Sequence, residues 1–453
     1  MHEVLILLIA FFILIFLNVP IAFSLCFLGS IALIFNGFDG KVVIRQLYNG
    51  LDSFSIMAVP FFLFAGALMG KGGITTRILD ISSAIVGRLR GGLGHVNIVA
   101  SMLFAGISGA AVSDAAALGG MLIPGMVKKG YSPEYGAAVT AASSMLGPII
   151  PPSITLVIFG GVMGVSIGGL FAAGLIPGVA LGIVQMITHS VIIHKRGFEE
   201  IGQNENFKNN YTSINNVNER ISFVKNTLAY FQNIFSSLKK GYLAVFMLVI
   251  IFGGILGGVF TPTEAASVAA VYALIITLIV SRTISIKEVG EMLKNDVVPT
   301  TGMIMLIIGA ASIISHYLAI TNVPKMVGIL FYSLTGNAYI FMILVSITLL
   351  ILGTFLSLHV SVVILGPILT PIAMEYGISP IQFGLLFVFA LNTAMITPPV
   401  GSVLYIVAGI AKINFLDVVK EILPYYLSFI VVIIIIIFYE PFTLFIPKLF
   451  GFI

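Results

Sequence analysis

The stretch SSMLGPIIPPSI, residues 143–154, places three prolines and a glycine inside one of the most hydrophobic parts of the chain. Proline has no backbone N–H, and its ring clashes with the carbonyl four residues earlier, so it interrupts a helix. A lipid bilayer offers no water to satisfy the backbone groups that are freed in this way. We therefore expect this break to lie inside the protein, where an ion or a substrate can bind the free carbonyls and amides.

The composition excludes a soluble protein. Of the 453 residues, 59% are hydrophobic and 9% are charged, whereas about a quarter of the residues in a soluble domain are charged. The single cysteine, Cys26, excludes a disulfide framework and is expected to pack against other apolar residues. The sequence predicts an all-α polytopic membrane protein. Apolar runs long enough to cross a hydrocarbon core of roughly 30 Å lie at about 3–18, 20–36, 54–70, 169–193, 241–260, 263–281, 296–319 and 424–447.

Two further apolar regions, 93–165 and 338–412, are too long for one crossing and are interrupted by Gly, Ser and Pro. They are related by a shift of 247 positions without a gap, which aligns Gly106 with Gly353, Gly119 with Gly366, Pro124 with Pro371, Gly130 with Gly377, Ser132 and Pro133 with Ser379 and Pro380, and Pro151 and Pro152 with Pro398 and Pro399. So many matches in register indicate an internal repeat. Each copy is predicted to contain a re-entrant helical hairpin, at about 93–126 and 338–374, followed by a helix broken at the Pro-Pro pair, at about 132–165 and 380–412.

The charged residues predict how the repeats are oriented. A polar segment, 195–240, separates a first membrane repeat (1–194) from a second (241–453), and it includes the amphipathic stretch YFQNIFSSLKK. Five predicted crossings lie between the two hairpins, and this odd number inverts the second repeat relative to the first. Of the 22 Lys and Arg residues, 18 fall on one predicted side. That side is cytoplasmic by the positive-inside rule, which makes 195–240 a cytoplasmic linker and places both termini in the periplasm.

The two breaks and the two hairpin tips carry the candidate chemistry. Inverted repeats with interrupted helices are typical of secondary transporters, where half-helix ends bind cations and anionic substrate groups. The tips, AGISGAAVSDAA (105–116) and GTFLSLHVS (353–361), have small residues that let the backbone approach an ion. A carboxylate within a membrane is a functional candidate by default. The candidate residues for a substrate cavity are Asp114, Ser144, Ser153, Ser357, His359, Thr397 and Gly401.

Simpler explanations compete with these. Each break could be a proline kink repaired by nearby hydroxyl groups, Ser113 or Asp114 could cap the second half of the hairpin, and His359 could be a packed, hydrogen-bonding residue. TPTEAA (261–266) predicts a capping box in which Glu264 is structural. GALMGKGG (66–73) lacks the spacing of a phosphate-binding loop. Without such a loop, a nucleophile–base motif or a His/Cys metal cluster, an enzyme or an ATP-driven pump is not expected.

At these residues the chain resembles the large membrane subunit, the DctM-like permease, of tripartite ATP-independent periplasmic (TRAP) transporters. The matching stretches are FFLFAGALMGKGGITTRI (61–78), FAGISGAAVSDAAALGGMLIPGMVKKGY (104–131), GPIIPPSI (147–154), FTPTEAAS (260–267) and ITPPVG (396–401). The resemblance implies sodium-coupled uptake of an organic acid, such as sialic acid or a C4-dicarboxylate, across the bacterial inner membrane. It implies an elevator mechanism, in which a transport domain moves against a scaffold. It also implies two partners, a periplasmic substrate-binding protein and a separate small four-helix membrane subunit.

The resemblance further implies sodium sites where a hairpin tip meets a broken helix. Carried over onto this chain, one site comprises Ser108, Gly109, Gly147, Ile150 and Pro152, and the other comprises Gly353, Thr354, Asn392 and Met395. After GTFL the family often has an aspartate, where this chain has Ser357. The second sodium site and the number of sodium ions therefore stay open, as does the identity of the acid. A stand-alone sodium–carboxylate symporter of similar repeat design is the alternative function.

Overall fold

The computed structural model describes residues 2–196 and 219–453, which form helices and turns without a strand. The first part contains α1 (His2–Phe16), α2 (Ile21–Phe35), α3 (Gly40–Leu51), α4 (Ala58–Lys71), α5 (Ile74–Val86), α6 (Gly92–Ser108), α7 (Ala111–Lys128), α8 (Pro133–Ser144), α9 (Ile154–Met163) and α10 (Ile167–Arg196). The second part contains α12 (Glu219–Leu256), α13 (Pro262–Ile275), α14 (Ile286–Met292), α15 (Val298–Ile320), α16 (Val323–Leu334), α17 (Ala338–Gly353), α18 (Leu358–Glu375), α19 (Pro380–Ala394), α20 (Ser402–Ala411), α21 (Phe415–Phe438) and α22 (Pro441–Leu449). Two π-helical turns, η1 (Ile276–Val280) and η2 (Leu293–Val297), extend α13 and precede α15.

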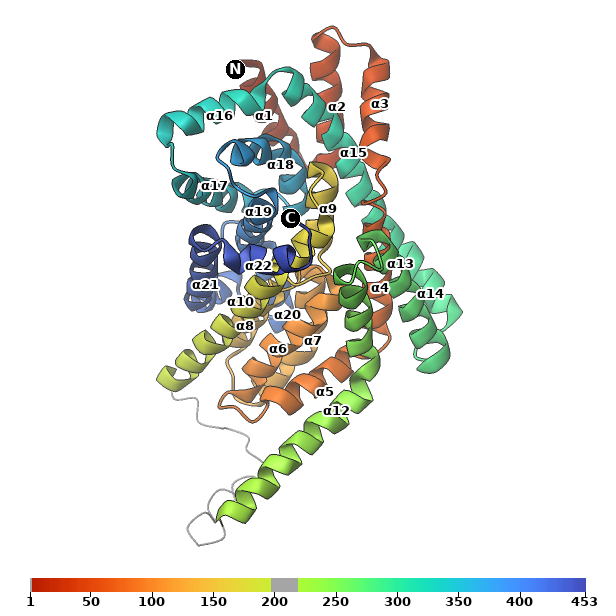
Figure 1. The fold of residues 1–453 in the computed structure, drawn as a ribbon, viewed down its shortest axis with the longest axis vertical. Helices are drawn as coiled ribbons and strands as arrows, with labels where there is room; N and C mark the ends of the chain where they lie inside the picture. Colours follow the sequence, from red (N-terminus) through yellow and green to blue (C-terminus); the bar gives the residue numbers. More distant parts are fainter. Residues whose placement is uncertain (1, 197–218) are drawn as a thin grey trace.

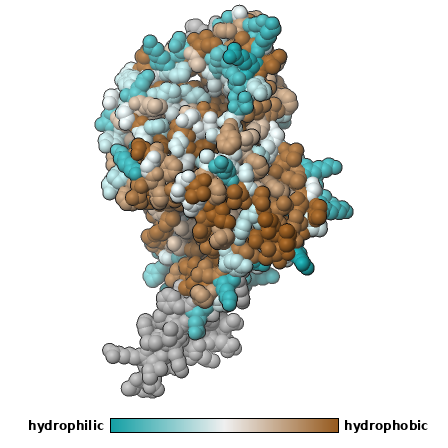
Figure 2. Space-filling model, turned by 45° about the vertical axis from the view of Figure 1, so that its right-hand side comes forward, coloured by the Kyte–Doolittle hydropathy of each residue, from teal (hydrophilic) through white to brown (hydrophobic). Residues whose placement is uncertain are grey.

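The long helices are apolar enough to cross a membrane. In the described part of the chain five helices have the length and composition of a crossing, and seven if the bent pairs α4 with α5 (73°) and α16 with α17 (117°) each count as one. Large apolar side chains are widely exposed, among them Phe16 (80%) and Phe35 (86%). Figure 2 shows a broad hydrophobic surface across the middle of the molecule, with hydrophilic side chains at the top and along the edges. Such a surface is stable against lipid and not against water, and the protein is a multi-pass membrane protein.

Both interrupted regions consist of a hairpin followed by a helix in two pieces. Helices α6 and α7 form one hairpin, and α17 and α18 form the other. Residues 145–153 separate α8 from α9, and residues 395–401 separate α19 from α20. Each break includes a cis peptide bond, at Pro151–Pro152 and Pro398–Pro399. Proline removes backbone donors at both places, which is why neither helix continues.

These elements pack into one group to which both halves of the chain contribute (Figure 1). Helix α20 packs on α7 and α8, while α9 packs on α18 and α19. Helix α21 covers α8 and α19, and α10 contacts α6, α19 and α21. Aromatic rings join the halves inside this group, because the centroids of Phe159 and Phe387 lie 5.5 Å apart. The two breaks are therefore held in a common core.

A second group of helices flanks the first. Helix α15 packs on α2 and α3, α13 packs on α4, and α12 packs on α5. Small residues allow close packing here, since a Cβ at Gly50 of α3 would lie 2.7 Å from the Cβ of Ser312 in α15. The two groups meet where α4 and α5 contact α6 and where α15 contacts α18. The second group thus borders both hairpins.

Several predicted elements differ from the observed ones. The crossing predicted at 424–447 has other bounds, because α21, which is long and apolar enough to cross a membrane, extends from Phe415 to Phe438, and α22 begins at Pro441. Proline is well suited to the first turn of a new helix and cannot donate the hydrogen bond that a continuing helix needs. Of the linker predicted at 195–240, residues 197–218 lie outside the described residues, and 219–240 form the first part of α12. Helices α3, α5 and α16 were not predicted as separate elements. The capping box is confirmed, because the side chains of Thr261 and Glu264 each pair with the other's backbone N–H.

Candidate functional site

The tip of the first hairpin contacts the first break directly. Helix α6 ends at Ser108, the chain turns at Gly109 with a φ of +63°, and α7 begins at Ala111. A Cβ at Gly109 would lie 2.5 Å from the carbonyl oxygen of Pro152, so only glycine fits both this backbone conformation and this close approach. The Ile154 N–H donates a hydrogen bond of 3.4 Å to the Gly109 carbonyl. We call this tip and this break the first hairpin–break unit.

Residues 145–153, which form the first break, are all buried. Helix α9 begins with a cap: the Leu156 N–H donates to Ser153 Oγ at 3.2 Å, and Ser153 Oγ donates to the Pro148 carbonyl at 2.6 Å. Five other carbonyls of the break accept no hydrogen bond from a residue that the structure describes, those of Gly147, Ile149, Ile150, Pro151 and Pro152. Buried carbonyls without partners are uncommon in proteins. These carbonyls, which include those of the predicted site residues Gly147, Ile150 and Pro152, are available to a ligand.

A buried carboxylate faces the same place. Asp114, in the first turn of α7, has no exposed surface. One of its oxygens, Oδ1, accepts a hydrogen bond from the Ser108 hydroxyl, and the other, Oδ2, has no hydrogen-bond partner among the described residues. A Cβ at Gly147 would lie 2.6 Å from this Oδ2. The alternative that Ser113 or Asp114 caps α7 is wrong, because its N-cap is Ala110 and no side chain makes a cap hydrogen bond.

The oxygens of the first hairpin–break unit fit a hard cation. An ionised carboxylate buried without a compensating charge costs several kcal/mol, so Oδ2 of Asp114 calls for a positively charged partner or a proton. Hard cations take carboxylate, carbonyl and hydroxyl oxygens as ligands, and all three kinds meet here. The described residues contain no group of three or more His, Cys, Asp and Glu side chains that could hold a metal ion. The unit is therefore suited to a cation bound largely through uncharged oxygens.

The second break, residues 395–401, differs in that it is partly exposed. As in the first break, several of its carbonyls accept hydrogen bonds. The Val403 N–H donates to the Met395 carbonyl at 3.2 Å, and the Tyr426 hydroxyl donates to the Ile396 carbonyl at 2.5 Å. Gly401, with a φ of +52°, is the N-cap of α20. The carbonyls of residues 397–400 accept no hydrogen bond from the described residues, and they differ from the free carbonyls of the first break in that their residues are partly or fully exposed.

The second hairpin tip contacts the helix that leads into this break, and we call the two together the second hairpin–break unit. A Cβ at Gly353 would lie 2.8 Å from the Ala394 Cβ and 2.9 Å from a methyl group of Leu391. The Thr354 hydroxyl donates to the Ile351 carbonyl at 2.8 Å, within its own hairpin. The residues that the resemblance assigns to a second sodium site are thus neighbours. The Thr354 hydroxyl donates its hydrogen within the hairpin and keeps its lone pairs for an ion, and the Met395 carbonyl already accepts one hydrogen bond.

One side chain joins the two breaks. Asn392 of α19 is fully buried, and its Nδ2 donates a hydrogen bond of 2.6 Å to the carbonyl of Met145, the first residue of the first break. Its Oδ1 has no partner in the part of the chain that the structure describes. Met145 and Asn392 are 247 positions apart, which is the offset of the internal repeat. The first break therefore meets the helix that leads into the second break, at equivalent positions of the two repeats.

Comparison with known families decides what kind of site this is. The model of the family described as "Tripartite ATP-independent periplasmic transporter, DctM component" matches residues 8–442. The chain belongs to the DctM family. The resemblance inferred from the sequence motifs is confirmed, and the two hairpin–break units lie within the matched region. The DctM family consists of transporter components, which agrees with a site made of ion-binding oxygens.

Relatives of this DctM chain have names that refer to different acids. It is 36% identical to the sialic acid TRAP transporter large permease protein SiaM of Vibrio cholerae over 438 residues, 96% of each chain. It is 36% identical to the 2,3-diketo-L-gulonate TRAP transporter large permease protein YiaN of Escherichia coli over 413 residues, 91% of each chain. It is 33% identical to the C4-dicarboxylate TRAP transporter large permease protein DctM of Pseudomonas aeruginosa over 406 residues, 90% of this chain and 89% of the relative. The similarity identifies a large permease and leaves the acid open.

The remaining predicted site residues of this DctM chain are more dispersed. The side chain of Ile150 packs on α10, where a Cβ at Gly178 would lie 2.5 Å from it, so only its backbone carbonyl can face a ligand. Ser144 and Thr397 donate hydrogen bonds to carbonyls of their own helix or helix end. Ser357 is exposed at the N-cap of α18, and His359 is half-buried one residue into that helix. Their part in a substrate cavity stays a prediction.

Sequence reasoning missed two residues of the site. Met145 supplies the carbonyl that Asn392 binds, and the offset of 247 positions between them could have revealed this pair. Gly66 of α4 approaches the first hairpin tip, since a Cβ there would lie 3.1 Å from the Ile107 carbonyl oxygen. Gly66 belongs to the glycine-rich stretch that we considered only as a phosphate loop. The contact between Gly66 and the first hairpin tip depends on how α4 packs in the folded protein and could not be predicted from the sequence.

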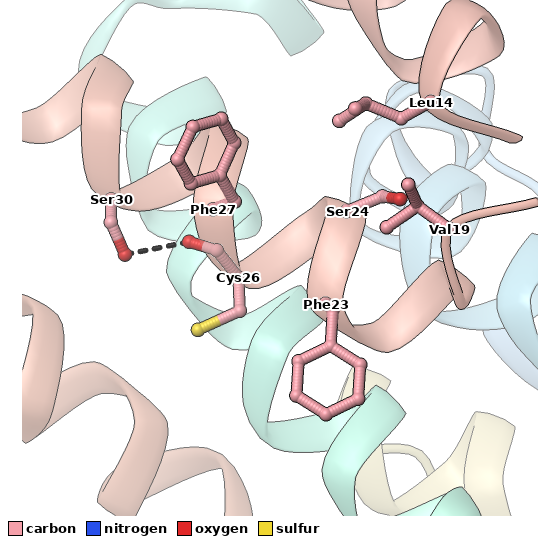
Figure 3. Close-up of a pocket in the computed structure, with 7 residues that line it drawn as sticks. All are labelled: Leu14, Val19, Phe23, Ser24, Cys26, Phe27 and Ser30. Carbon is pink, nitrogen blue, oxygen red and sulfur yellow. Dashed lines mark hydrogen bonds between the residues drawn. The ribbon is translucent and has the colours of Figure 1, made fainter. Parts of the chain in front are cut away.

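A surface groove between α1 and α2 lies apart from both units (Figure 3). It is lined by Leu14, Val19, Phe23, Ser24, Cys26, Phe27 and Ser30. Its two hydroxyl groups donate to carbonyls of the chain around α2, Ser24 to that of Pro20 at 3.4 Å and Ser30 to that of Cys26 at 2.6 Å. Neither hydroxyl is free to hold an organic acid. Cys26 is partly buried and packs against apolar neighbours, as predicted.

Proposed function

We propose that this protein is the membrane permease of a three-component system that takes up an organic acid, of the sialic acid or C4-dicarboxylate type, together with sodium. The observation that carries the proposal is the first hairpin–break unit, where a buried carboxylate oxygen without a partner lies beside unpartnered carbonyls. Sodium suits a site of several oxygens with little charge. The ATP-independent description of the family supports an ion gradient as the energy source. Two sodium ions that enter through 100 mV would supply about 4.6 kcal/mol, enough for more than about a thousandfold accumulation of a neutral solute.

The two membrane halves are proposed to be inverted repeats. Gly119 of α7 faces Ile410 of α20, and Gly366 of α18 faces Met163 of α9, with distances of 3.3 Å and 3.0 Å from the position of a Cβ on each glycine. The offset of 247 positions converts the first pair into the second with the partners exchanged. An exchange of this kind is the property of two-fold symmetry. It supports a two-fold axis in the membrane plane, which would pass near the hydrogen bond that joins the two breaks.

An inverted repeat makes a topological prediction that can be measured. Lys129 and Tyr376 occupy equivalent positions after the two hairpins. On the proposed topology the basic side is cytoplasmic, and both termini are periplasmic. Cysteines placed at Lys129 and Tyr376 should then react with a membrane-impermeant reagent from the cytoplasm and from the periplasm, respectively. Reaction of both from one side would contradict the inversion.

We propose an elevator mechanism, in which the group that holds the two units moves against the group built around α15. The contact between α4 and the first hairpin tip supports this division. Gly66 presents no side chain to the tip, so backbone meets backbone there. Such a contact has no interlocking side chains that would resist sliding. The close packing of α15 on α2 and α3 supports a rigid scaffold.

The proposed partners are a periplasmic binding protein, which delivers the acid, and a small membrane subunit. The word "tripartite" in the family description supports two components besides this one. The proposed location is the inner membrane of a bacterium. The alternative is a symporter that works without either partner.

The proposal is tested by uptake into proteoliposomes that contain this chain and its small membrane subunit. The radiolabelled acid is added outside with the binding protein, and sodium is supplied as an inward gradient. We expect uptake only when both the binding protein and the gradient are present, without an effect of ATP. Replacement of sodium by choline is the matched control. Uptake that persists without the binding protein favours the stand-alone symporter. Uptake that is the same with and without a sodium gradient contradicts sodium coupling.

A further inference from the structure

The first hairpin is attached to its broken helix by buried hydrogen bonds between side chains. Asn97 Nδ2 of α6 donates to Thr140 Oγ1 of α8 at 2.7 Å, and Ser101 Oγ donates to Ser143 Oγ at 2.9 Å. All four residues are buried. A hydrogen bond requires a particular distance and angle, and inside a membrane no water replaces a lost partner. Helix α6 therefore cannot leave α8 without unpairing several buried polar groups.

The equivalent contact in the second hairpin is apolar. The offset of 247 positions replaces Asn97, Thr140 and Ser143 by Leu344, Phe387 and Ala390. Thr348, the equivalent of Ser101, donates to the Leu344 carbonyl of its own helix at 2.8 Å. Among the described residues no hydrogen bond joins α17 to α19, although the two helices pack on each other. Apolar contacts are non-directional, so α17 can move away from α19 without breaking a hydrogen bond.

The base of the first hairpin is attached as well. The Nε2 of His189 in α10 lies 3.0 Å from the Gly91 carbonyl and therefore donates to it, and the Ser190 hydroxyl lies 3.2 Å from Nε2 of His95 in α6. The side chains at the equivalent positions cannot form such bonds, because these positions hold Ala338, Met342, Ile436 and Ile437. The first hairpin is thus fixed at its base and along its length.

The two hairpin tips differ in the same sense. In the first unit the Ile154 N–H donates to the Gly109 carbonyl, which joins the tip to the break, and the Ser108 hydroxyl donates to Asp114, which joins the two arms. In the part of the chain that the structure describes, no hydrogen bond joins residues 353–357 of the second tip to the second break. Phe355 of this tip is 54% exposed, whereas residues 104–109 of the first tip are all buried.

We propose that the second hairpin is the gate of the transport site. It moves away from the second break to admit the acid, while the first hairpin stays fixed to the rest of its group. The proposal rests on the proposed function, whose topology places the base of the second hairpin in the periplasm, where the binding protein delivers the acid. Movement of α17 breaks only apolar contacts, and a membrane surrounds apolar side chains as favourably as a neighbouring helix does.

The test locks each hairpin to its broken helix with a disulfide in a Cys26→Ser background. One protein carries Asn97→Cys with Thr140→Cys, and the other carries the equivalent pair, Leu344→Cys with Phe387→Cys. Each protein is oxidised with copper phenanthroline, and uptake of radiolabelled sialic acid and succinate is measured in the proteoliposomes described above. The first disulfide should preserve uptake, because it replaces the hydrogen bond that it removes. The second should abolish uptake until a reductant is added. The four single-cysteine proteins are the controls.

Uptake that survives a complete disulfide in the second pair overturns the gate. Hydrogen exchange of the wild-type protein in detergent, without substrate, gives a second measurement that depends on no variant. Amides that open locally exchange faster, so residues 353–357 should exchange faster than the equivalent residues 106–110, and equal or slower exchange overturns the gate too. If wild-type protein takes up neither acid under any condition, the proposed function fails, and the exchange rates still decide whether the second hairpin opens.

Discussion

The two helix breaks look alike in sequence and differ in their surroundings. In the first break every residue from 145 to 153 is buried, and the carbonyls of Gly147, Ile150 and Pro152 have no partner among the described residues. In the second break residues 399 and 400 are exposed, although side-chain and backbone donors bind some of the carbonyls in both breaks. A Pro-Pro pair fixes where a helix stops, but it does not determine what the freed carbonyls bind.

The two breaks free the same kinds of backbone group but place them in different surroundings. Backbone groups in a buried break need partners that water cannot supply, so the free carbonyls of the first break are left for a ligand. The second break can use a tyrosine hydroxyl, its own helix and the surrounding medium. The first break is therefore the stronger candidate for a permanent ion site, and the second for a site that opens and closes.

The largest expected effect is on chemical accessibility. In a Cys26→Ser background, a cysteine at Val400, which is 43% exposed, should react completely with a maleimide, and a cysteine at Ile149, which is 0% exposed, should not react. Mass spectrometry of the purified protein measures both. Equal reactivity at the two positions would erase the contrast between the breaks. If the maleimide reactivity of the cysteine at position 149 rises when substrate and binding protein are added, the first break opens during the transport cycle, and the two breaks differ in when they are accessible.

The next largest effect is expected at the first hairpin tip. Gly109→Leu should abolish sodium-dependent uptake, because the new side chain meets the Pro152 carbonyl and the left-handed backbone costs roughly 1–2 kcal/mol. Gly130→Leu is the matched control, since Gly130 has a φ of +89° and is exposed. The Gly130→Leu protein should be destabilised by a similar cost of the left-handed backbone, but its sodium-dependent uptake should be retained. Loss of uptake in both variants would mean that strain, and not the contact with the break, is responsible.

The sequence was informative about this fold where the determinants are local. Proline pairs and glycines act on the chain within a few residues, and this is why the helix interruptions at 145–153 and 395–401 lie where the motifs indicate. The capping box at Thr261 was readable for the same reason. The split at Tyr439 was not, because a single proline inside an apolar run is compatible with a continuous helix. Pro424 inside α21 shows this.

The site was less predictable, because partners of a backbone group depend on tertiary packing. Sequence motifs drew attention to Asp114, but only the structure reveals that Ser108 takes one carboxylate oxygen and leaves the other free. Likewise, only the structure reveals that Asn392, which was expected to bind an ion, donates its Nδ2 to the Met145 carbonyl across the two halves and leaves its Oδ1 without a partner among the described residues. Periodicity carries no information about such contacts between distant segments.

An intermediate effect is expected at the link between the breaks. Asn392→Ala removes the donor to the Met145 carbonyl and leaves a buried acceptor unsatisfied, which typically costs about 1–3 kcal/mol. Thr393→Val is the matched control on the same helix, since that hydroxyl only bonds back to the Phe389 carbonyl at 2.9 Å. Thermal unfolding in detergent compares the two. A loss in Thr393→Val as large as that in Asn392→Ala would argue against a special role for the link.

The smallest effect is expected at Tyr426, whose hydroxyl binds the Ile396 carbonyl in the second break. Tyr426→Phe removes one hydrogen bond worth about 1 kcal/mol, and because this break is partly exposed, other donors can replace it. Unfolding should therefore shift less than in Asn392→Ala, and sodium binding without substrate should not change. Tyr439→Phe, at an exposed tyrosine, controls for loss of a hydroxyl. If Tyr426→Phe destabilises more than Asn392→Ala, the second break depends on its partners as strongly as the first, and the contrast drawn between the two breaks is wrong.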